Sequence, residues 1–175
     1  MDDDARPVNS STNLETQAPA VSAAIADAEA IVDRVAVDER EARVERDRLR
    51  AGEAFEAPVA GRGAPSLLPG EAYVDVRSAA RLERMGVDGQ EPLSGRLYLT
   101  TERLVLSGRG GMAVALSSID EVSLIGEKLL VALEDGTGLC VDVSSPRVFR
   151  VRIAHAIALL RGVVGPPRPL PDPVM

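Results

Sequence analysis

Apolar and polar side chains alternate along much of residues 72–143. Every second position is apolar in seven short runs, which is the pattern of a β-strand with one buried face. The apolar positions are Ala72, Val74 and Val76; Leu97 and Leu99; Leu104 and Leu106; Met112, Val114 and Leu116; Val122 and Leu124; Leu129, Val131 and Leu133; and Leu139, Val141 and Val143. The pattern predicts seven antiparallel strands, with a loop and one helical turn in segment 78–93. The Asp135-Gly136 pair predicts a two-residue hairpin between the last two strands.

The residues that follow the seventh run predict one amphipathic helix. Ser145 is its expected N-cap and Pro146 its first residue, because proline lacks the N–H that would stay unpaired there. Gly162 predicts its end, since a left-handed glycine commonly closes a helix. The apolar face of this helix consists of Phe149, Ile153, Ala156, Ile157 and Leu160. A helix of this length can plug the open end of a small curled sheet.

The N-terminal third of the chain differs in composition. Residues 1–20 are polar and are expected to be disordered, whereas residues 21–54 are rich in Ala, Glu and Arg, which favour a helix. One stripe of that helix is apolar up to Val35 and then gives way to charged residues; it consists of Val21, Ile25, Ala28, Val32 and Val35. Two interpretations stay open at this point. The helix forms a coiled coil or docking surface through which the chain oligomerises, or it is a solvated, charged helix.

Prolines and glycines mark two further segments. Residues 55–66 are predicted to be a linker. Residues 163–175 form a Pro-rich tail that tends toward polyproline II, either as a ligand for a partner domain or as an unstructured end. The domain itself is therefore expected within residues 67–162, and it is expected to fold without the rest of the chain.

Composition and charge exclude several classes of function. The net charge is −7, and residues 1–67 account for a balance of −6, so the domain is nearly neutral and carries no basic footprint for a nucleic acid. No apolar run approaches the roughly 18 residues of a spanning helix, and the acidic, polar start predicts a cytoplasmic protein. With Cys140 the only cysteine and His155 the only histidine, we expect neither a disulfide nor a metal site, and no cofactor.

No pattern of catalytic residues is visible in the sequence. Asp120 and Glu121 are adjacent, so they point to opposite faces of a strand and cannot work as a pair. The chain has no Gly-x-Ser-x-Gly elbow, and the glycine-rich residues 108–111 lack the Lys-Ser/Thr pair of a phosphate-binding loop. His155 lies off the apolar face of its helix, which indicates a partly exposed structural histidine. We therefore predict that the chain is not an enzyme.

Four short stretches carry a resemblance to a known family. They are "GE" at Gly70-Glu71, "GRLYLTTERLVL" at residues 95–106, "ALSSIDEVSL" at residues 115–124 and "LEDG" at residues 133–136. With the seven strands and the final helix, they make residues 67–162 resemble the bacterial GRAM-like and PH-like domains of the pleckstrin-homology superfold. The resemblance implies a mainly β, seven-stranded antiparallel barrel or sandwich that is capped by the C-terminal helix. Ala115, where proline is common, and the lack of tryptophan depart from the family pattern.

The resemblance also implies a ligand site and a function. PH-type lipid binders carry basic residues at the end of strand one and along strand two. Arg77 and Arg96 match these places, with Arg81 and Arg84 in the segment between them, although Tyr98 stands where a second basic residue is usual. The implied function is a non-enzymatic adaptor that engages a protein segment or, weakly, an anionic membrane surface at the inner face of the membrane. The alternatives are a structural subunit that oligomerises through the N-terminal helix, and an enzyme with an unrecognised site.

Overall fold

The computed structural model describes residues 14–59, 61–86 and 91–165. The chain forms two compact units, Met1–Val37 and Asp38–Met175. Of the residues 1–20 that were predicted to be disordered, residues 1–13 lie outside the described residues, as does the tail from residue 166 onward, whereas the prediction is wrong for residues 14–20, which form part of a helix.

Helix α1 spans Leu14–Arg50 and contributes to both units. It begins earlier than the predicted start at residue 21, because the good helix formers around Pro19 outweigh the one hydrogen bond that proline cannot donate. It also ends before the predicted residue 54. Gly52 adopts a left-handed φ of 83°, and the N–H of Glu53 donates to the carbonyl of Arg48, which closes the helix.

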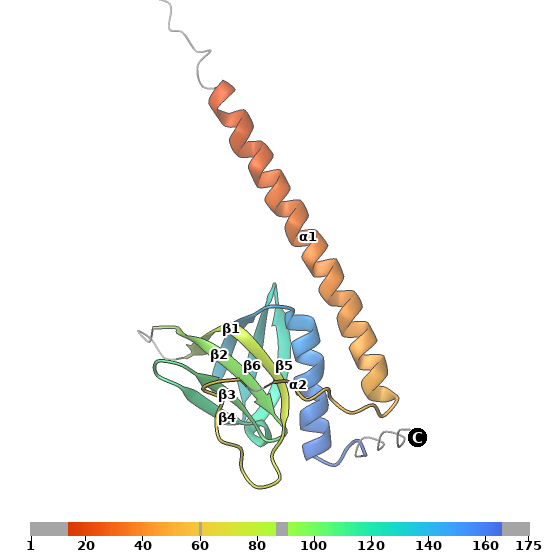
Figure 1. Cartoon of the computed structure of the whole chain (residues 1–175). Helices are drawn as coiled ribbons and strands as arrows, with labels where there is room; N and C mark the ends of the chain where they lie inside the picture. Colours follow the sequence, from red (N-terminus) through yellow and green to blue (C-terminus); the bar gives the residue numbers. More distant parts are fainter. Residues whose placement is uncertain (1–13, 60, 87–90, 166–175) are drawn as a thin grey trace, which may run out of the picture. The chain divides into compact units, whose positions relative to one another are not determined.

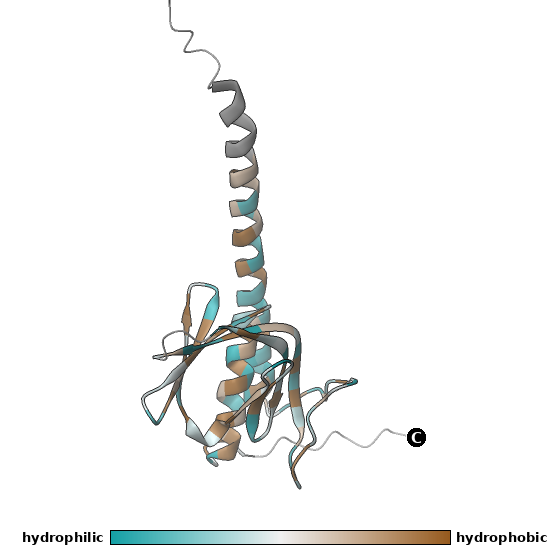
Figure 2. Ribbon diagram, turned by 90° about the vertical axis from the view of Figure 1, so that its left-hand side faces the viewer, coloured by the Kyte–Doolittle hydropathy of each residue, from teal (hydrophilic) through white to brown (hydrophobic). Residues whose placement is uncertain are grey.

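The second unit contains the predicted seven-stranded antiparallel sheet, in the order β4-β3-β2-β1-β7-β6-β5 (Figure 1). Its strands are β1 (Tyr73–Met85), β2 (Leu93–Thr100), β3 (Arg103–Ser107), β4 (Met112–Ala115), β5 (Ile119–Ile125), β6 (Lys128–Leu133) and β7 (Gly138–Val143). A 3₁₀ turn, η2 (Leu116–Ser118), joins β4 to β5. Helix α2 (Pro146–Leu160) follows β7. The mainly β fold with an N-terminal and a C-terminal helix is thus confirmed. Figure 2 shows that hydrophobic and hydrophilic residues both occur along the strands.

Strand β1 is much longer than predicted, because it continues through the segment 78–93 as far as Met85. The helical turn expected there is wrong, since residues 78–85 form a strand, and residues 87–90 of the expected loop lie outside the described residues. The pairing of β1 with β2 shifts by one residue twice, between Tyr73 and Asp75 and between Arg77 and Ala80. Each β-bulge exchanges the faces on which successive side chains lie. Asp75 and Arg77 therefore face α2, although simple alternation places them on the outer face.

The core lies between the curled sheet and α2. It is almost entirely aliphatic, as the low aromatic content requires, and Leu97, Leu99, Leu116 and Leu129 are among its fully buried members. Phe149, Ile153 and Ala156 of α2 are buried against it, which confirms the predicted apolar face. Leu160, the last residue assigned to that face, is instead 41% exposed, because it lies at the end of the helix.

Residues 61–66, which were expected to belong to a linker, lie along the outer face of β1 and β2. The backbone carbonyls of Arg62, Pro65 and Ser66 accept hydrogen bonds from the side chains of Arg96, Tyr73 and Arg103. This layer explains why Tyr98 is fully buried although it alternates with the core residues of β2. The sequence gives no periodic signal for such a segment, because its contacts are made by backbone carbonyls.

The N-terminus of α2 is capped by a residue of α1 rather than by Ser145. Ser145 has a left-handed φ of 50°, and its side chain makes no capping hydrogen bond. The carboxylate of Asp38 accepts hydrogen bonds from the backbone N–H groups of Arg147 and Val148 instead. Ser145 was therefore the wrong N-cap, because the extended backbone that places an N-cap side chain over the first turn is missing there. The end of α2 is as predicted, with Gly162 at a φ of 66°.

Candidate binding groove on strands β1 and β2

An open groove of about 1060 Å³ lies on the outer side of β1, β2 and β7, and we call it the β1–β2 trough. Most of its lining residues are small. They are Arg62, Gly63, Ser78, Ala79, Ala80, Arg81, Ser94, Gly95, Arg96, Tyr98, Ser107, Gly108, Asp142, Val143 and Ser144. A trough of this size is within the range of ligand-binding sites, and its openness suits an extended ligand better than an enclosed one.

Two features of the strands shape the trough, a bulge in β1 and a glycine in β2. The second bulge leaves Ser78 and Ala79 without partners on β2. On the opposite side, a Cβ atom at Gly95 would lie 2.2 Å from the carbonyl oxygen of Ser107, so only glycine fits between β2 and β3 at this point. Small side chains and an interrupted ladder leave backbone groups accessible at the floor of the trough.

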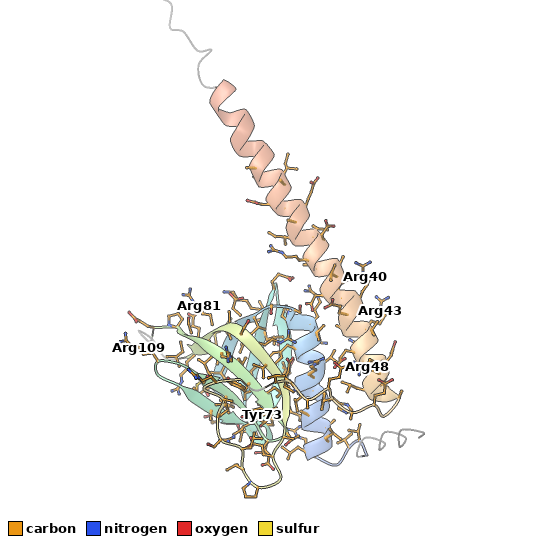
Figure 3. The ribbon with its side chains drawn as sticks, in the orientation of Figure 1. Arg40, Arg43, Arg48, Tyr73, Arg81 and Arg109 are labelled. Carbon is orange, nitrogen blue, oxygen red and sulfur yellow. The ribbon has the colours of Figure 1, made fainter. Side chains whose placement is uncertain are left out.

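Three arginines give the trough a basic character. Arg81 is exposed and points away from the sheet (Figure 3), and it forms no ion pair with another of the described residues. Arg96 donates to the carbonyl of Arg62 at 3.4 Å, so it keeps most of its donors for a ligand. Asp142 is the one acidic residue among the residues that line the trough, and Lys128 approaches it at 3.9 Å. The residues that line the trough therefore favour an anionic ligand.

The structure brings together two of the four predicted site residues. Arg81 and Arg96 line the same trough, whereas Arg84 lies over β4, where its Nη2 is 3.5 Å from the sulfur of Met112. Arg77 faces α2 because of the bulges, and its guanidinium lies 5.1 Å from the centre of the Phe149 ring. Sequence reasoning missed Arg62, because an arginine in a Pro/Gly-rich segment belongs to no periodic pattern.

Arg77 takes part in a network of charges that joins β1 to both helices. It donates to Asp75 at 2.6 Å and to the carbonyl of Ser144, which lines the trough. Asp75 also pairs with Arg152 of α2, and Arg152 donates to Glu45 of α1 at 2.8 Å. These side chains are mostly buried, so removal of one member leaves a neighbouring charge without its partner. Arg77 therefore contacts the trough only through the backbone of Ser144, and its side chain faces α2.

A second cluster fixes the starts of β1 and β3. The carboxylate of Glu71 is buried and accepts hydrogen bonds from Arg103, the hydroxyl of Thr100 and the N–H of Leu68. Burial by itself opposes ionisation, but these three hydrogen bonds outweigh it and lower the pKa of Glu71 to about 2. This cluster holds the segment before β1 on the sheet.

The remaining reactive groups do not gather into a site. His155 packs edge-on against Phe55 with ring centres 5.3 Å apart, and burial lowers the pKa of its imidazole. Cys140 is a half-buried free thiol on β7. Within residues 14–59, 61–86 and 91–165, no cluster of three or more His, Cys, Asp or Glu side chains could hold a metal ion. In the same ranges, no helix has the length and apolar character needed to cross a membrane.

Comparison with known proteins rests on structure, because no protein-family model and no curated protein matches this chain. The N-terminal PH domain of Vps36 superposes with a TM-score of 0.51 at 15% identity, and the match covers 63% of this chain and 95% of that domain. The chain has a PH-like fold. A C-terminal domain of an unknown protein from Leishmania infantum matches this PH-like chain less well, with a TM-score of 0.38 at 15% identity over 51% of the chain and 87% of that domain.

Proposed function

We propose that the PH-like domain is a non-enzymatic binding module that holds an acidic protein segment in the β1–β2 trough. The observation that carries the proposal is the combination of a small-residue floor at a β-bulge with a rim of arginines. An extended segment can approach the backbone of such a floor, and its carboxylates can accept charge-assisted hydrogen bonds from Arg81 and Arg96.

The chemistry of the lining supports binding rather than catalysis. Serines are present at Ser78, Ser94, Ser107 and Ser144, but neither His nor Cys occurs among the residues that line the trough. A serine nucleophile requires a neighbouring base, and Asp142 is the one candidate in the lining. The resemblance to GRAM-like and PH-like domains, noted from the hairpin at residues 95–106, is consistent with a binding module.

An anionic membrane surface is the second candidate ligand, because the same arginines attract lipid phosphates. Each basic residue near such a surface contributes only about 1 kcal/mol. The two largest apolar residues in the lining, Tyr98 and Val143, are both buried, so the trough offers no side chain to insert into a bilayer. We therefore expect weak, salt-dependent attachment to anionic vesicles at most.

The test compares two probes on the ¹⁵N-labelled full chain by NMR. One probe is a short peptide of alternating glutamate and serine, and the other is a phosphatidylcholine vesicle that contains phosphatidylserine. With the peptide, we expect the amide shifts to concentrate at residues 78–81 and 94–96. The double variant Arg81→Ala/Arg96→Ala should weaken peptide binding by roughly ten-fold or more, because one charge-assisted hydrogen bond contributes about 1.5–3 kcal/mol and about 1.4 kcal/mol corresponds to a factor of ten.

The double variant Arg40→Ala/Arg43→Ala is the matched control. It removes the same net charge from exposed positions of α1 that lie outside the trough (Figure 3). Equal losses in both double variants would mean that net charge alone governs binding, and the proposed site would be wrong. Tight binding to the vesicles that persists in high salt would replace the protein segment with a lipid headgroup as the ligand.

A further inference from the structure

A further hollow lies between residues 46–50 of α1 and helix α2, within the second unit, and we call it the α1–α2 groove. Its volume is about 310 Å³, at the lower end of the range of small-molecule sites. Its lining residues are Arg46, Leu49, Arg50, Arg150, Val151, Ala154, His155 and Val164. The groove shares no lining residue with the β1–β2 trough, so it is a separate surface of the domain.

The groove forms where one face of α1 meets one face of α2. Residues 46, 49 and 50 of α1 are three and four positions apart, and residues 150 and 154 of α2, like residues 151 and 155, are four positions apart. Each set therefore lies on one side of its helix. The two walls are held together, because Asp38 accepts from the N–H of Val148 and Glu45 pairs with Arg152, one turn further along both helices.

The apolar part of the lining suits an alkyl chain. Leu49 is buried, and Val151 and Val164 are half-buried, so apolar surface lies inside the groove. The backbone N–H and carbonyl groups of both helices are paired within the helices. The walls therefore offer few backbone partners to an extended protein segment, in contrast to the strands around the trough.

The charged part of the lining suits an anion. Arg46 and Arg50 are exposed and Arg150 is half-buried, and none of the three forms an ion pair with another of the described residues. Arg147 and Arg152 of α2, by contrast, pair with acidic residues of α1. No acidic side chain occurs among the residues that line the groove. Three like charges around one small hollow repel one another, and a bound anion relieves that repulsion.

From these observations we propose that the α1–α2 groove binds a medium-chain fatty carboxylate, with its carboxylate between the arginines of the two helices and its alkyl chain over Leu49 and Val151. The planar fork of a guanidinium matches the two oxygens of a carboxylate, and the chain removes apolar surface from water. The PH-like domain then carries two sites on different surfaces, one for a protein segment and one for a small amphiphile.

NMR titration of the ¹⁵N-labelled full chain with octanoate, kept below its micelle concentration, tests the proposal. We expect amide shifts at residues 46–50 and 150–155, and a shift of the imidazole signals of His155, the only histidine of the chain. Acetate carries the charge without the chain, and 1-octanol carries the chain without the charge. Each should bind at least roughly ten-fold more weakly than octanoate. Equal affinity for either compound, or shifts confined to residues 78–81 and 94–96, would overturn the proposal.

The double variant Arg46→Ala/Arg150→Ala tests the role of the arginines. It should weaken octanoate binding by roughly ten-fold or more, because one charge-assisted hydrogen bond is enough for such a change. Arg40→Ala/Arg43→Ala is the matched control, since it removes the same charge from exposed positions of α1 that do not line the groove. Equal losses in the two double variants would show that net charge governs binding and would overturn the proposal.

A substitution that leaves the charge unchanged tests the groove itself. Ala154 is exposed, so Ala154→Phe should fill the groove without entering the core and should abolish octanoate binding. Ala30→Phe, at an exposed position of the first unit, should bind octanoate like the native chain. A well-dispersed amide spectrum checks that each variant is folded. Full binding by folded Ala154→Phe, or larger groove shifts with a peptide of residues 165–175 than with octanoate, would overturn the proposal.

Discussion

Asp38 of α1 accepts a hydrogen bond from the backbone N–H of Val148 at 3.2 Å, although the two residues are 110 positions apart in the chain. The other carboxylate oxygen of Asp38 accepts from the N–H of Arg147 at 2.9 Å. A carboxylate at the start of a helix pairs N–H groups that have no partner within the helix and complements the positive end of the helix dipole. Residues 38–50 of α1 thus belong to the folded domain.

Removal of this cap is expected to destabilise the second unit. Asp38→Ala should lower the free energy of unfolding by about 1–2 kcal/mol, the usual range for loss of an N-cap, with more lost if the buried N–H of Val148 stays without a hydrogen-bond partner. Asp38→Asn should recover only part of the difference, because the one amide oxygen of asparagine can accept from only one of the two backbone N–H groups. Denaturant unfolding at pH 7 measures both. Glu39→Ala is the control, because Glu39 is exposed and meets Arg147 only at 3.6 Å, so it should cost less than about 0.5 kcal/mol.

The boundary of the folding unit leads to a second prediction. The fragment of residues 38–165 should unfold cooperatively and at a higher temperature than the fragment of residues 67–162. The shorter fragment lacks the Asp38 cap, the buried Leu49 and the Phe55 side chain that packs on the core. Calorimetry of both fragments provides the comparison. Equal melting temperatures would mean that residues 38–66 add nothing to the stability of the domain.

The pKa of Glu71 predicts how stability depends on pH. The folded protein keeps this carboxylate ionised down to a pKa of about 2, below the ordinary value of 4.5. Its stabilising effect should therefore be fully present above pH 4.5 and should be lost as the pH falls toward 2. Glu71→Gln should flatten that part of the pH profile and destabilise the domain at pH 7 by up to about 3 kcal/mol. Glu134→Gln, at an exposed position, should leave the profile unchanged.

Packing of α2 on the sheet gives a fourth prediction. Phe149 is fully buried, so Phe149→Ala should cost about 3–5 kcal/mol through lost transfer energy and a cavity. Arg150→Ala, on the next residue of the same helix, should cost less than about 0.5 kcal/mol. Urea unfolding of the two variants measures the difference. Equal effects would mean that the buried face of α2 has been assigned wrongly.

Gly95 gives a fifth prediction, because the floor of the trough depends on it. Gly95→Ala should destabilise the domain by about 3 kcal/mol or more, the upper end of the usual range for overpacking. The new methyl group would meet the carbonyl of Ser107 and push β2 and β3 apart. Gly165→Ala is the control, since nothing lies within 4 Å of the added Cβ there. Loss of peptide binding by a folded Gly95→Ala protein would tie this close approach to the trough.

The sequence was sufficient to predict the strands and the helix in which apolar residues recur at a regular spacing from end to end. Strands such as β6 and β7 alternate without interruption, and α2 repeats its apolar residues at helical spacing, so both were located correctly. Strand β1 was predicted too short because two bulges break its alternation. A bulge depends on how two strands meet, and a periodicity along one strand does not contain that information.

The charged residues of α1 illustrate the same limit. Asp38, Ala42, Glu45 and Leu49 continue the helical spacing of the apolar stripe, and all four are buried. The continuous run of apolar residues at this spacing ends at Val35, because the stripe continues with the charged residues Asp38 and Glu45. Their partners, Arg147 and Arg152, lie more than a hundred residues away. Likewise, Arg81 and Arg96 were placed in the candidate site by resemblance, whereas Arg62 needed the structure.

The absence of tryptophan and the position of the two tyrosines have a practical consequence. Tyr73 and Tyr98 are the chain's only tyrosines, and their rings lie 5.9 Å apart on β1 and β2, with Tyr98 in the lining of the trough. Ultraviolet emission of the unlabelled protein therefore originates almost wholly from this one region. An occupant of the trough should therefore alter the intensity of that emission, which provides a native optical signal for binding in the trough.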